Sequence, residues 1–273
     1  MAKRRKKKDR QLLLAVVVIA LVIFLVIGGL VLALSSLGGE TAELPATQPR
    51  ATAAPNSYDP QGFYREDGFL HYRGEHLVGI DVSTHQELID WEQVASSGVE
   101  FAILRIGYRG SSRGDLYEDE TFRANLRGAK EAGLLVGGYF FSQAINPRDA
   151  VEEAQYVLKR IKGWDLDLPV VFDWEYVNAS ARTARVNRHQ LTVITRTFCA
   201  HIAKAGFDPM IYFNLNQGSK LLYLPVLQDY PFWLAYYNET LDTDYRVDYW
   251  QYSYTGKVPG IDADVDLNLY FPH

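Results

Sequence analysis

The heptapeptide Pro169-Val-Val-Phe-Asp-Trp-Glu175 decides the fold. A short apolar run that starts after a proline and ends in two carboxylates is typical of a buried, parallel strand with charge at its C-terminal end. Side chains at positions i and i+2 leave a strand on the same face, so Asp173 and Glu175 should point the same way with Cα atoms about 6.5 Å apart. Two carboxyl groups that close raise the pKa of one of them and leave one acid and one base. The same seven residues would also be found if the two carboxylates were merely solvated at the strand end, or if they formed ion pairs with an arginine.

Strand and helix patterns alternate on both sides of this heptapeptide. Apolar strand patterns at 77–82, 101–107 and 134–141 are each followed by a segment of helical periodicity, and a fifth strand is expected at 210–213. One helix is expected from Leu88 to Ala95, another from Pro147 and another from an Asn187…Gln190 capping box. The alternation predicts a parallel sheet, either a barrel or a doubly wound sheet. No glycine-rich phosphate motif follows the first strand, so nucleotide binding has no support.

The alternation of strand and helix patterns ends after the fifth strand. Strand-like segments at 232–237, 247–252 and 265–268 are separated by about a dozen residues or fewer, which is short for a helical crossover. These three strands should therefore close the sheet through loops. The predicted fold class is α/β, a TIM-like barrel of five βα units plus three further strands.

The N-terminus has the pattern of a membrane anchor. Residues 1–11 form a basic tail, and residues 12–34 contain no charged side chain. Twenty-three helical residues rise about 34 Å, enough to cross a hydrocarbon core of about 30 Å. The positive-inside rule keeps the tail in the cytoplasm and places the rest of this single-pass protein outside the cell membrane. A cleaved signal peptide with a site at Ala33-Leu-Ser35 is the alternative. No nucleic-acid partner is expected, because the apolar span follows the basic run directly.

The remainder divides into a linker and a folded part. Residues 35–57 are rich in Ala, Thr, Pro and Gly and poor in large apolar side chains, which predicts a flexible linker. Residues 58–77 should form a hairpin around the turn dipeptide Asp67-Gly68. Residues 78–273 should form one barrel domain.

Acidic and aromatic residues collect at the C-terminal ends of the predicted strands, the edge that carries the active sites of βα barrels. The candidate catalytic carboxylates are Glu175, Asp173, Asp81 and Asp266. The candidate substrate-binding side chains are Tyr139, Phe141, Tyr212, Trp233, Tyr237, Trp250 and Gln251. Carboxylates and flat aromatic faces, without a His-rich cluster or Cys pairs, suit a carbohydrate better than metal or acyl chemistry, so no metal or cofactor is expected.

Seven stretches carry a family resemblance, in order, between about Val78 and Phe271. They are Gly79-Ile-Asp-Val-Ser-Thr-His-Gln86, Ile89-Asp-Trp91, Phe101-Ala-Ile-Leu-Arg-Ile-Gly-Tyr108, Tyr139-Phe-Phe-Ser-Gln-Ala144, Phe172-Asp-Trp-Glu175, Trp250-Gln-Tyr252 and Val258-Pro-Gly-Ile261 with Val265-Asp-Leu-Asn268. Together they resemble the family 25 glycoside hydrolases, the muramidase type of lysozyme.

The resemblance implies an enzyme that cuts the β-1,4 bond after N-acetylmuramic acid in peptidoglycan glycan strands. In the family's pattern Glu175 matches the general acid, Asp173 its partner, and Asp81 and Asp266 the other two site carboxylates. Three alternatives stay open: a glycan-binding module without catalysis, a scaffold of the cell-wall machinery, and a chitinase-like glycosidase.

The strand spacing leaves the stereochemical course open. Carboxyl groups on Cα atoms about 6.5 Å apart can adopt both the retaining separation of about 5 to 5.5 Å and the inverting separation of about 6.5 to 9.5 Å. The implied substrate carries an N-acetyl group beside the reacting carbon, and some glycosidases use that group as the nucleophile. We hypothesise such a substrate-assisted, retaining course, in which Asp173 orients the acetamido group.

Overall fold

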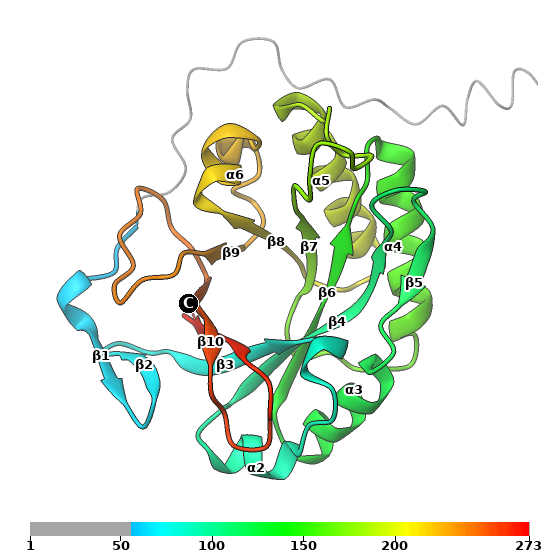
Figure 1. The fold of residues 1–273 in the computed structure, drawn as a ribbon. Helices are drawn as coiled ribbons and strands as arrows, with labels where there is room; N and C mark the ends of the chain where they lie inside the picture. The colour runs from blue at the N-terminus through cyan, green and yellow to red at the C-terminus, as the bar shows by residue number, and fades with distance from the viewer. Residues whose placement is uncertain (1–55, 273) are drawn as a thin grey trace, which may run out of the picture. The chain divides into compact units, whose positions relative to one another are not determined.

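The computed structural model describes residues 56–272, which form a closed βα barrel (Figure 1). The predicted basic tail (1–11), the predicted transmembrane helix (12–34) and most of the predicted linker (35–57) lie outside the described residues. Within residues 56–272, no helix combines the length and the apolar composition needed to cross a membrane.

Eight strands form the barrel wall in the order β3-β4-β6-β7-β8-β9-β10-β11, and β11 closes the ring against β3. Their bounds are β3 Leu77–Val82, β4 Phe101–Arg109, β6 Leu135–Ser142, β7 Val170–Trp174, β8 Pro209–Asn214, β9 Phe232–Ala235, β10 Tyr249–Gly256 and β11 Val265–Tyr270. Neighbours from β3 to β10 pair in parallel, whereas β11 is antiparallel to both β10 and β3. The predicted barrel of five βα units and three further strands is therefore confirmed. A short strand, β5 (Leu116–Glu118), pairs with the end of β4 and was not predicted.

Helices on the outside of the ring follow the first five barrel strands. They are α2 Trp91–Ser96, α3 Phe122–Glu131, α4 Pro147–Ile161, α5 Arg188–Lys204 and α6 Leu215–Lys220, with 3₁₀ turns at Pro60–Gly62, Thr84–Gln86 and Leu224–Val226. Pro147 opens α4, and the capping box of Asn187 and Gln190 opens α5, both as predicted. The helix expected from Leu88 starts only at Trp91.

The late start of α2 has a local cause. The Asp90 side chain accepts a hydrogen bond from the backbone N–H of Gln93 and so caps the helix. Glu87 has φ of 54°, a conformation that a helix does not continue through. Leu88 precedes the cap and is 92% exposed, so the prediction that it lies on the helix is wrong.

Alternation along the strands divides the apolar side chains into two layers. The inward-facing layer fills the barrel with Phe101, Ile103, Val171, Met210, Trp233 and Tyr249. The outward-facing side chains, such as Phe172 on β7, pack under the helices in a larger core that includes Phe198 of α5. Apolar side chains fill the interior of the barrel. The polar side chains of the inner face therefore lie near the C-terminal ends of the strands.

A hairpin covers the part of the wall that has no helices. It consists of β1 (Phe63–Glu66) and β2 (Phe69–Tyr72), and its Asp67-Gly68 turn has φ values of 50° and 88°, as the turn dipeptide predicts. The Phe63 ring lies 5.2 Å from the Trp250 ring and 6.3 Å from the Phe271 ring. The hairpin thus shields the outer face of β10 and β11, which are joined to their neighbours by loops.

Candidate active site

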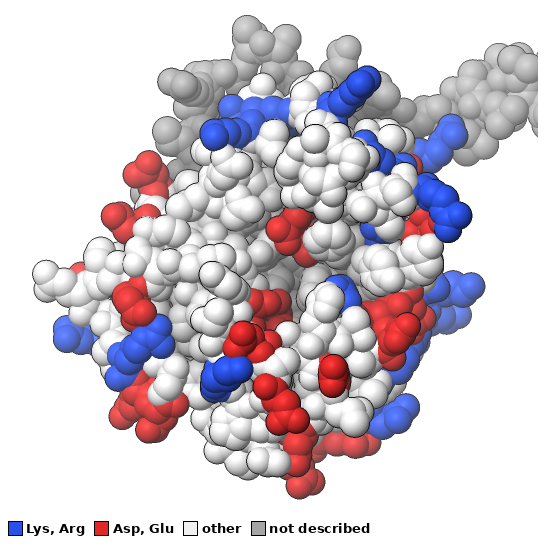
Figure 2. Space-filling view, in the orientation of Figure 1, with Lys and Arg blue, Asp and Glu red and all other residues white. Residues whose placement is uncertain are grey.

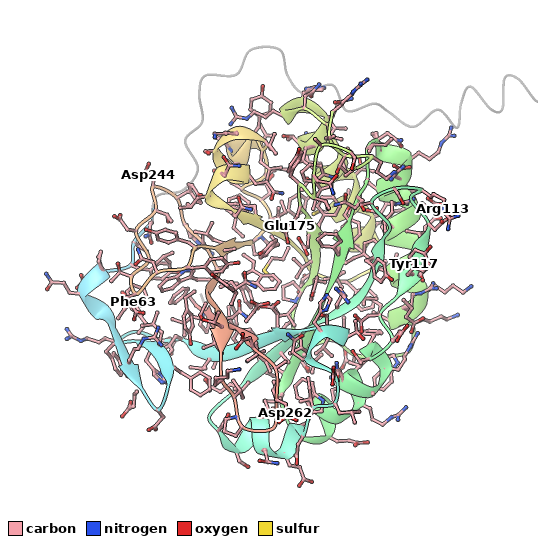
Figure 3. All side chains as sticks on the ribbon, in the orientation of Figure 1. Phe63, Arg113, Tyr117, Glu175, Asp244 and Asp262 are labelled. Carbon is pink, nitrogen blue, oxygen red and sulfur yellow. The ribbon has the colours of Figure 1, made fainter. Side chains whose placement is uncertain are left out.

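The strand β7 delivers two carboxyl groups to the mouth of the barrel. Asp173 faces inward next to the end of the strand and is 5% exposed. Glu175 follows the last residue of β7, and Figure 3 labels it where the chain leaves the ring of strands. Between them, Trp174 faces outward and its indole N–H donates a hydrogen bond of 2.9 Å to the carbonyl of Ala144. Glu175 lies one residue beyond the strand, and its carboxyl group is close enough to Asp173 for its charge to raise the pKa of Asp173, as expected for two side chains on one face.

A second carboxyl pair lies on the opposite wall. Asp81 of β3 and Asp266 of β11 are direct neighbours across the strand pair. Asp81 Oδ2 accepts hydrogen bonds from Gln251 Nε2 at 2.9 Å and from Asn268 Nδ2 at 2.8 Å. Because β7 stands three strands from β3 and four from β11 in the ring, the two pairs face each other across the mouth. Figure 2 shows the surface hollowed over this region, with acidic side chains in and around the hollow.

Burial and mutual repulsion shift the proton equilibria of the Asp81 and Asp266 pair. Burial raises the pKa of Asp266 to about 9, and the charge of Asp81 adds to the effect. Burial also raises the pKa of Asp81 to about 6, although hydrogen bonds from Asn268, Gln251 and Asp266 lower it. At neutral pH the protonated Asp266 can therefore donate to the Asp81 carboxylate.

The β7 pair also binds protons more tightly than free carboxyl groups do. Burial raises the pKa of Glu175, and the charge of Asp81 raises it further. Burial holds the pKa of Asp173 well above its usual range, with further contributions from the charges of Glu175 and Asp81, while the Arg105 guanidinium opposes them. Among the described residues, Asp173 Oδ1 is buried without a hydrogen-bond partner. The pair therefore offers both a retained proton and an unsatisfied acceptor.

Aromatic side chains join the two walls. The hydroxyl groups of Tyr212 and Tyr237 donate to Gln251 Oε1 at 3.1 and 3.2 Å, and Gln251 in turn donates to Asp81. The Trp233 ring lies 4.9 Å from the Tyr212 ring and 6.3 Å from the Tyr139 ring. Trp233 and Tyr212 are buried and form the floor of the mouth, whereas the Tyr237 ring is 51% exposed and offers a flat face on which a sugar can stack.

Two other predicted substrate-binding residues have different positions. Phe141 of β6 lies opposite Asp173 of the neighbouring strand β7, and its side chain is partly exposed at the mouth. Trp250 is fully buried, and its indole N–H donates at 2.7 Å to the carbonyl of Tyr236. Its ring packs on the hairpin outside the wall, so the structure does not bring Trp250 together with the other candidates. Adjacent residues of a strand face opposite sides, and the inward place on β10 belongs to Gln251.

An ion pair close to the site was not predicted from the sequence. Arg105 follows Phe101 and Ile103 on the inner face of β4, and its Nε donates to Asp119 Oδ2 at 2.7 Å. The same oxygen accepts from the backbone N–H of Thr84 at 3.0 Å. The inward alternation along β4 was a signal that could have identified Arg105.

The end of β7 is held by two buried side-chain amides, which were also not predicted from the sequence. Gln143 Nε2 donates to the carbonyl of Glu175 at 2.8 Å, and Gln217 Nε2 donates to the carbonyl of Trp174. Gln143 is fully buried, and the Thr183 hydroxyl donates to its Oε1 at 3.0 Å. Glu175 lies beyond the strand ladder, so these side-chain bonds fix its backbone instead.

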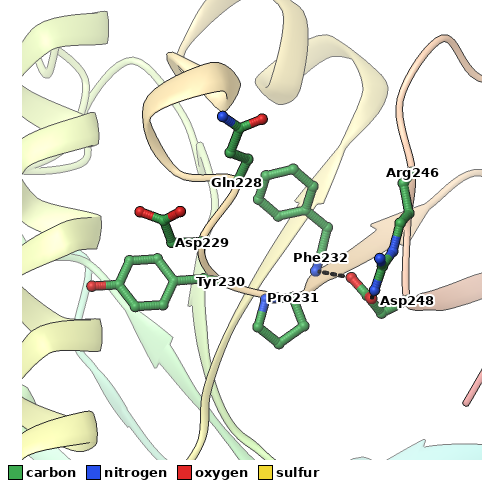
Figure 4. Close-up of a pocket in the computed structure, with 7 residues that line it drawn as sticks. All are labelled: Gln228, Asp229, Tyr230, Pro231, Phe232, Arg246 and Asp248. Carbon is green, nitrogen blue, oxygen red and sulfur yellow. Dashed lines mark hydrogen bonds and ion pairs between the residues drawn. The ribbon is translucent and has the colours of Figure 1, made fainter. Parts of the chain in front are cut away.

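A pocket at the opposite end of the strands is not part of this site. It has a volume of about 220 Å³ and is lined by Gln228, Asp229, Tyr230, Pro231, Phe232, Arg246 and Asp248 (Figure 4). Asp248 accepts from the backbone N–H of Phe232 at 2.8 Å and pairs with Arg246 at 2.7 Å. Within residues 56–272, no group of three or more His, Cys, Asp or Glu side chains is arranged to hold a metal ion.

Comparisons with known proteins agree with this geometry. The model of glycosyl hydrolases family 25 matches residues 80–261. Lysozyme M1 of Streptomyces globisporus is 31% identical over 207 residues, which cover 71% of this chain and 67% of that protein. The autolysin LytC of Streptococcus pneumoniae, solved in complex with a synthetic peptidoglycan ligand, has a TM-score of 0.64 and 26% identity, covering 77% of this chain and 52% of its own. A bacterial lysozyme from Streptomyces coelicolor has a TM-score of 0.58 and 28% identity, covering 72% and 92% respectively.

The family match extends over most of the described barrel and contains Asp81, Asp173 and Glu175, while Asp266 follows it closely. This chain spans about half the length of the LytC chain. The chain therefore belongs to glycosyl hydrolases family 25 and is a glycoside hydrolase.

Proposed function

We propose that this protein is an N-acetylmuramidase that hydrolyses the β-1,4 bond between N-acetylmuramic acid and N-acetylglucosamine in peptidoglycan. The observation that carries the proposal is the pair formed by the buried Asp173 and the half-buried Glu175, opposite Asp81 and Asp266 in an aromatic-lined mouth. Hydrolysis of a glycosidic bond needs a proton donor and a group that stabilises positive charge at the reacting carbon. Similarity to Lysozyme M1 and to LytC, whose structure holds a synthetic peptidoglycan ligand, supports this substrate.

In the proposed mechanism Glu175 protonates the leaving sugar oxygen and later accepts a proton from water. Its raised pKa suits the first step at neutral pH. The N-acetyl group of the substrate attacks the reacting carbon, and Asp173 Oδ1 accepts a hydrogen bond from the acetamido N–H. That oxygen is buried and lacks a partner among the described residues, as an acceptor reserved for the substrate would.

The second carboxyl pair is assigned to electrostatic support. Asp81, with a pKa of about 6, carries the negative charge of the opposite wall at neutral pH. This charge lies across the mouth from Glu175 and raises the pKa of that acid. It would also stabilise the positive charge that develops on the sugar ring in the transition state.

The proposed location is the outer side of the cell membrane, where peptidoglycan lies. The support is the sequence alone: a basic tail at residues 1–11 followed by an uncharged apolar stretch at 12–34. Protease added to intact protoplasts should remove the barrel domain and leave a short membrane fragment. Protection of the domain in sealed cells, with digestion after lysis, would contradict this placement.

A gel with embedded cell walls tests the activity itself. The full chain should give a clearing band that the Glu175→Gln variant does not give. Binding to the walls without clearing would favour a glycan-binding module, and neither binding nor clearing would favour a scaffold. Digestion of chitin oligomers in preference to peptidoglycan would favour a chitinase-like enzyme.

A further inference from the structure

Charge is distributed very unevenly along the folded domain. Residues 176–228 contain six Lys and Arg residues and a single acid, Asp208. The rest of residues 56–273 contains 14 Lys and Arg residues against 29 Asp and Glu residues. The cationic segment comprises the loop after β7, α5, β8 and α6, so it occupies one side of the barrel. An uneven field of this kind orients a charged ligand.

Three cations of this segment stand at the mouth, and we call them the basic rim: Arg185, Arg188 and Lys220. Arg185 lies in the loop that leaves the C-terminal end of β7, Arg188 begins α5, and Lys220 ends α6, which follows β8. Arg185 and Lys220 are exposed and form no ion pair with a described carboxylate. Arg188 donates to the carbonyl of Leu222 at 2.8 Å, which brings it close to the end of α6.

The opposite side of the same face is acidic. Glu87 and Asp90 lie between β3 and α2, and Asp262 lies in the turn between β10 and β11. All three are exposed, and the Asp90 backbone N–H donates to Gly260 of that turn at 2.9 Å. In the ring of eight strands, β8 is four places from β3, so the two rims face each other. Figure 2 shows Lys and Arg side chains over α6 and the start of α5, and acidic side chains below the central hollow.

We propose that the basic rim binds the carboxylates of the stem peptides that project from N-acetylmuramic acid, and so sets how the glycan strand lies across the mouth. This inference rests on the proposed function. The glycan backbone is uncharged, and the peptide attached to the lactyl group of each muramic acid carries its negative charge. Such a strand is attracted at the basic rim and repelled at the acidic rim.

The test compares soluble stem-bearing glycan strands before and after the carboxylates of their stem peptides have been converted to amides with carbodiimide and ammonia. Removal of the peptides by an amidase would instead leave a lactyl carboxylate on each muramic acid. For the purified full-length chain, kcat/KM should be higher on the strands whose stem peptides keep their carboxylates, and raising the salt concentration should reduce this preference. The double variant Arg185→Glu, Lys220→Glu should lower the ratio of kcat/KM for the two substrates about fivefold. Its preference should no longer depend on salt.

The matched control is Lys162→Glu, Lys204→Glu, which makes the same charge change at two exposed residues at the far ends of α4 and α5. This control should keep the substrate ratio of the wild type. An unchanged ratio in the Arg185, Lys220 variant, or an equal change in the control, would overturn the inference while leaving the proposed function intact. If the wild-type chain cleaved neither substrate, the proposed function itself would fail.

Discussion

Asp173 has the most informative surroundings of any single residue, because a buried carboxyl oxygen rarely lacks a partner. In the substrate-assisted course this oxygen orients the acetamido group, so Asp173→Asn should lower kcat about 10²- to 10³-fold by analogy with the loss of one stabilising group. No sugar should become attached to the protein, as mass spectrometry of the quenched reaction can verify. Asp165→Asn, an exposed change just before β7, is the control and should keep full activity.

The anomeric form of the first product is the second readout for Asp173. Attack by the acetamido group followed by water gives a product that keeps the β configuration. Proton NMR during the first turnovers distinguishes the anomers before they equilibrate. An α product would reject the substrate-assisted course in favour of direct attack by water.

The raised pKa of Asp266 leads to a prediction of how the stability of the fold depends on pH. Its pKa is about 9 in the folded chain against an ordinary value of 3.8, so between these pH values the folded chain binds more protons than the unfolded chain. The free energy of unfolding therefore falls as pH rises through that interval. Asp266→Asn removes this ionisation and should melt at a higher temperature than the wild type at pH 8 to 9, with a smaller difference near pH 4. Thermal melts across this range measure the difference, and a constant offset at all pH values would argue against the assignment.

At the scale of elements, the end of β7 depends on side chains from its neighbours. Gln143→Met keeps the volume of the side chain but leaves the carbonyl of Glu175 and the hydroxyl of Thr183 without their partner. We expect unfolding to become easier by about 1–3 kcal/mol. Because Glu175 then loses its fixed position, kcat should fall about tenfold while KM stays close to that of the wild type.

The control for Gln143 is Asn125→Leu on α3. Asn125 is also buried, and its Nδ2 donates to the Thr121 hydroxyl at 3.1 Å, far along the chain from β7. It should lose stability in the same range and keep the kcat of the folded fraction. Equal kcat losses in both variants would reduce the role of Gln143 to general stability.

The elements that the sequence predicted well are those with a local signal. Pro147, the capping box at Asn187 and the Asp67-Gly68 turn act over a few residues, and each is found where expected. The start of α2 was wrong because the apolar Leu88 and Ile89 continue the helical pattern past the Asp90 cap. The eight barrel strands were predicted near their observed positions because a run of apolar residues bounded by turns leaves few alternatives, whereas the three-residue strand β5 has no such run.

The site residues also divide into those with a local sequence signal and those without one. Asp173 and Glu175 follow from one strand, whereas Gln143 and Gln217 act on that strand from other units, and no local pattern reports such contacts. The placement of Trp250 was a different case, because strand alternation already implies that it and Gln251 face opposite sides. Trp250 was predicted as a substrate-binding residue because the segment is rich in aromatic residues, although the strand alternation argued against it.

On the scale of the whole molecule, the way in which the barrel closes determines which part of its wall needs another cover. The last three strands return through loops. Within residues 56–272 no helix shields β10 and β11, and the hairpin of residues 63–72 packs its rings there instead. On its other side β11 pairs with β3, where Asp266 lies opposite Asp81.

The identity of the new reducing end tests the central claim most directly. Peptidoglycan strands digested by the purified full-length chain are reduced with borohydride and analysed by mass spectrometry. We expect N-acetylmuramitol at the cut ends, and we expect Glu175→Gln to release it about 10²- to 10⁴-fold more slowly while melting as a folded protein. N-acetylglucosaminitol at the cut ends, or near wild-type release by the variant, would contradict the account.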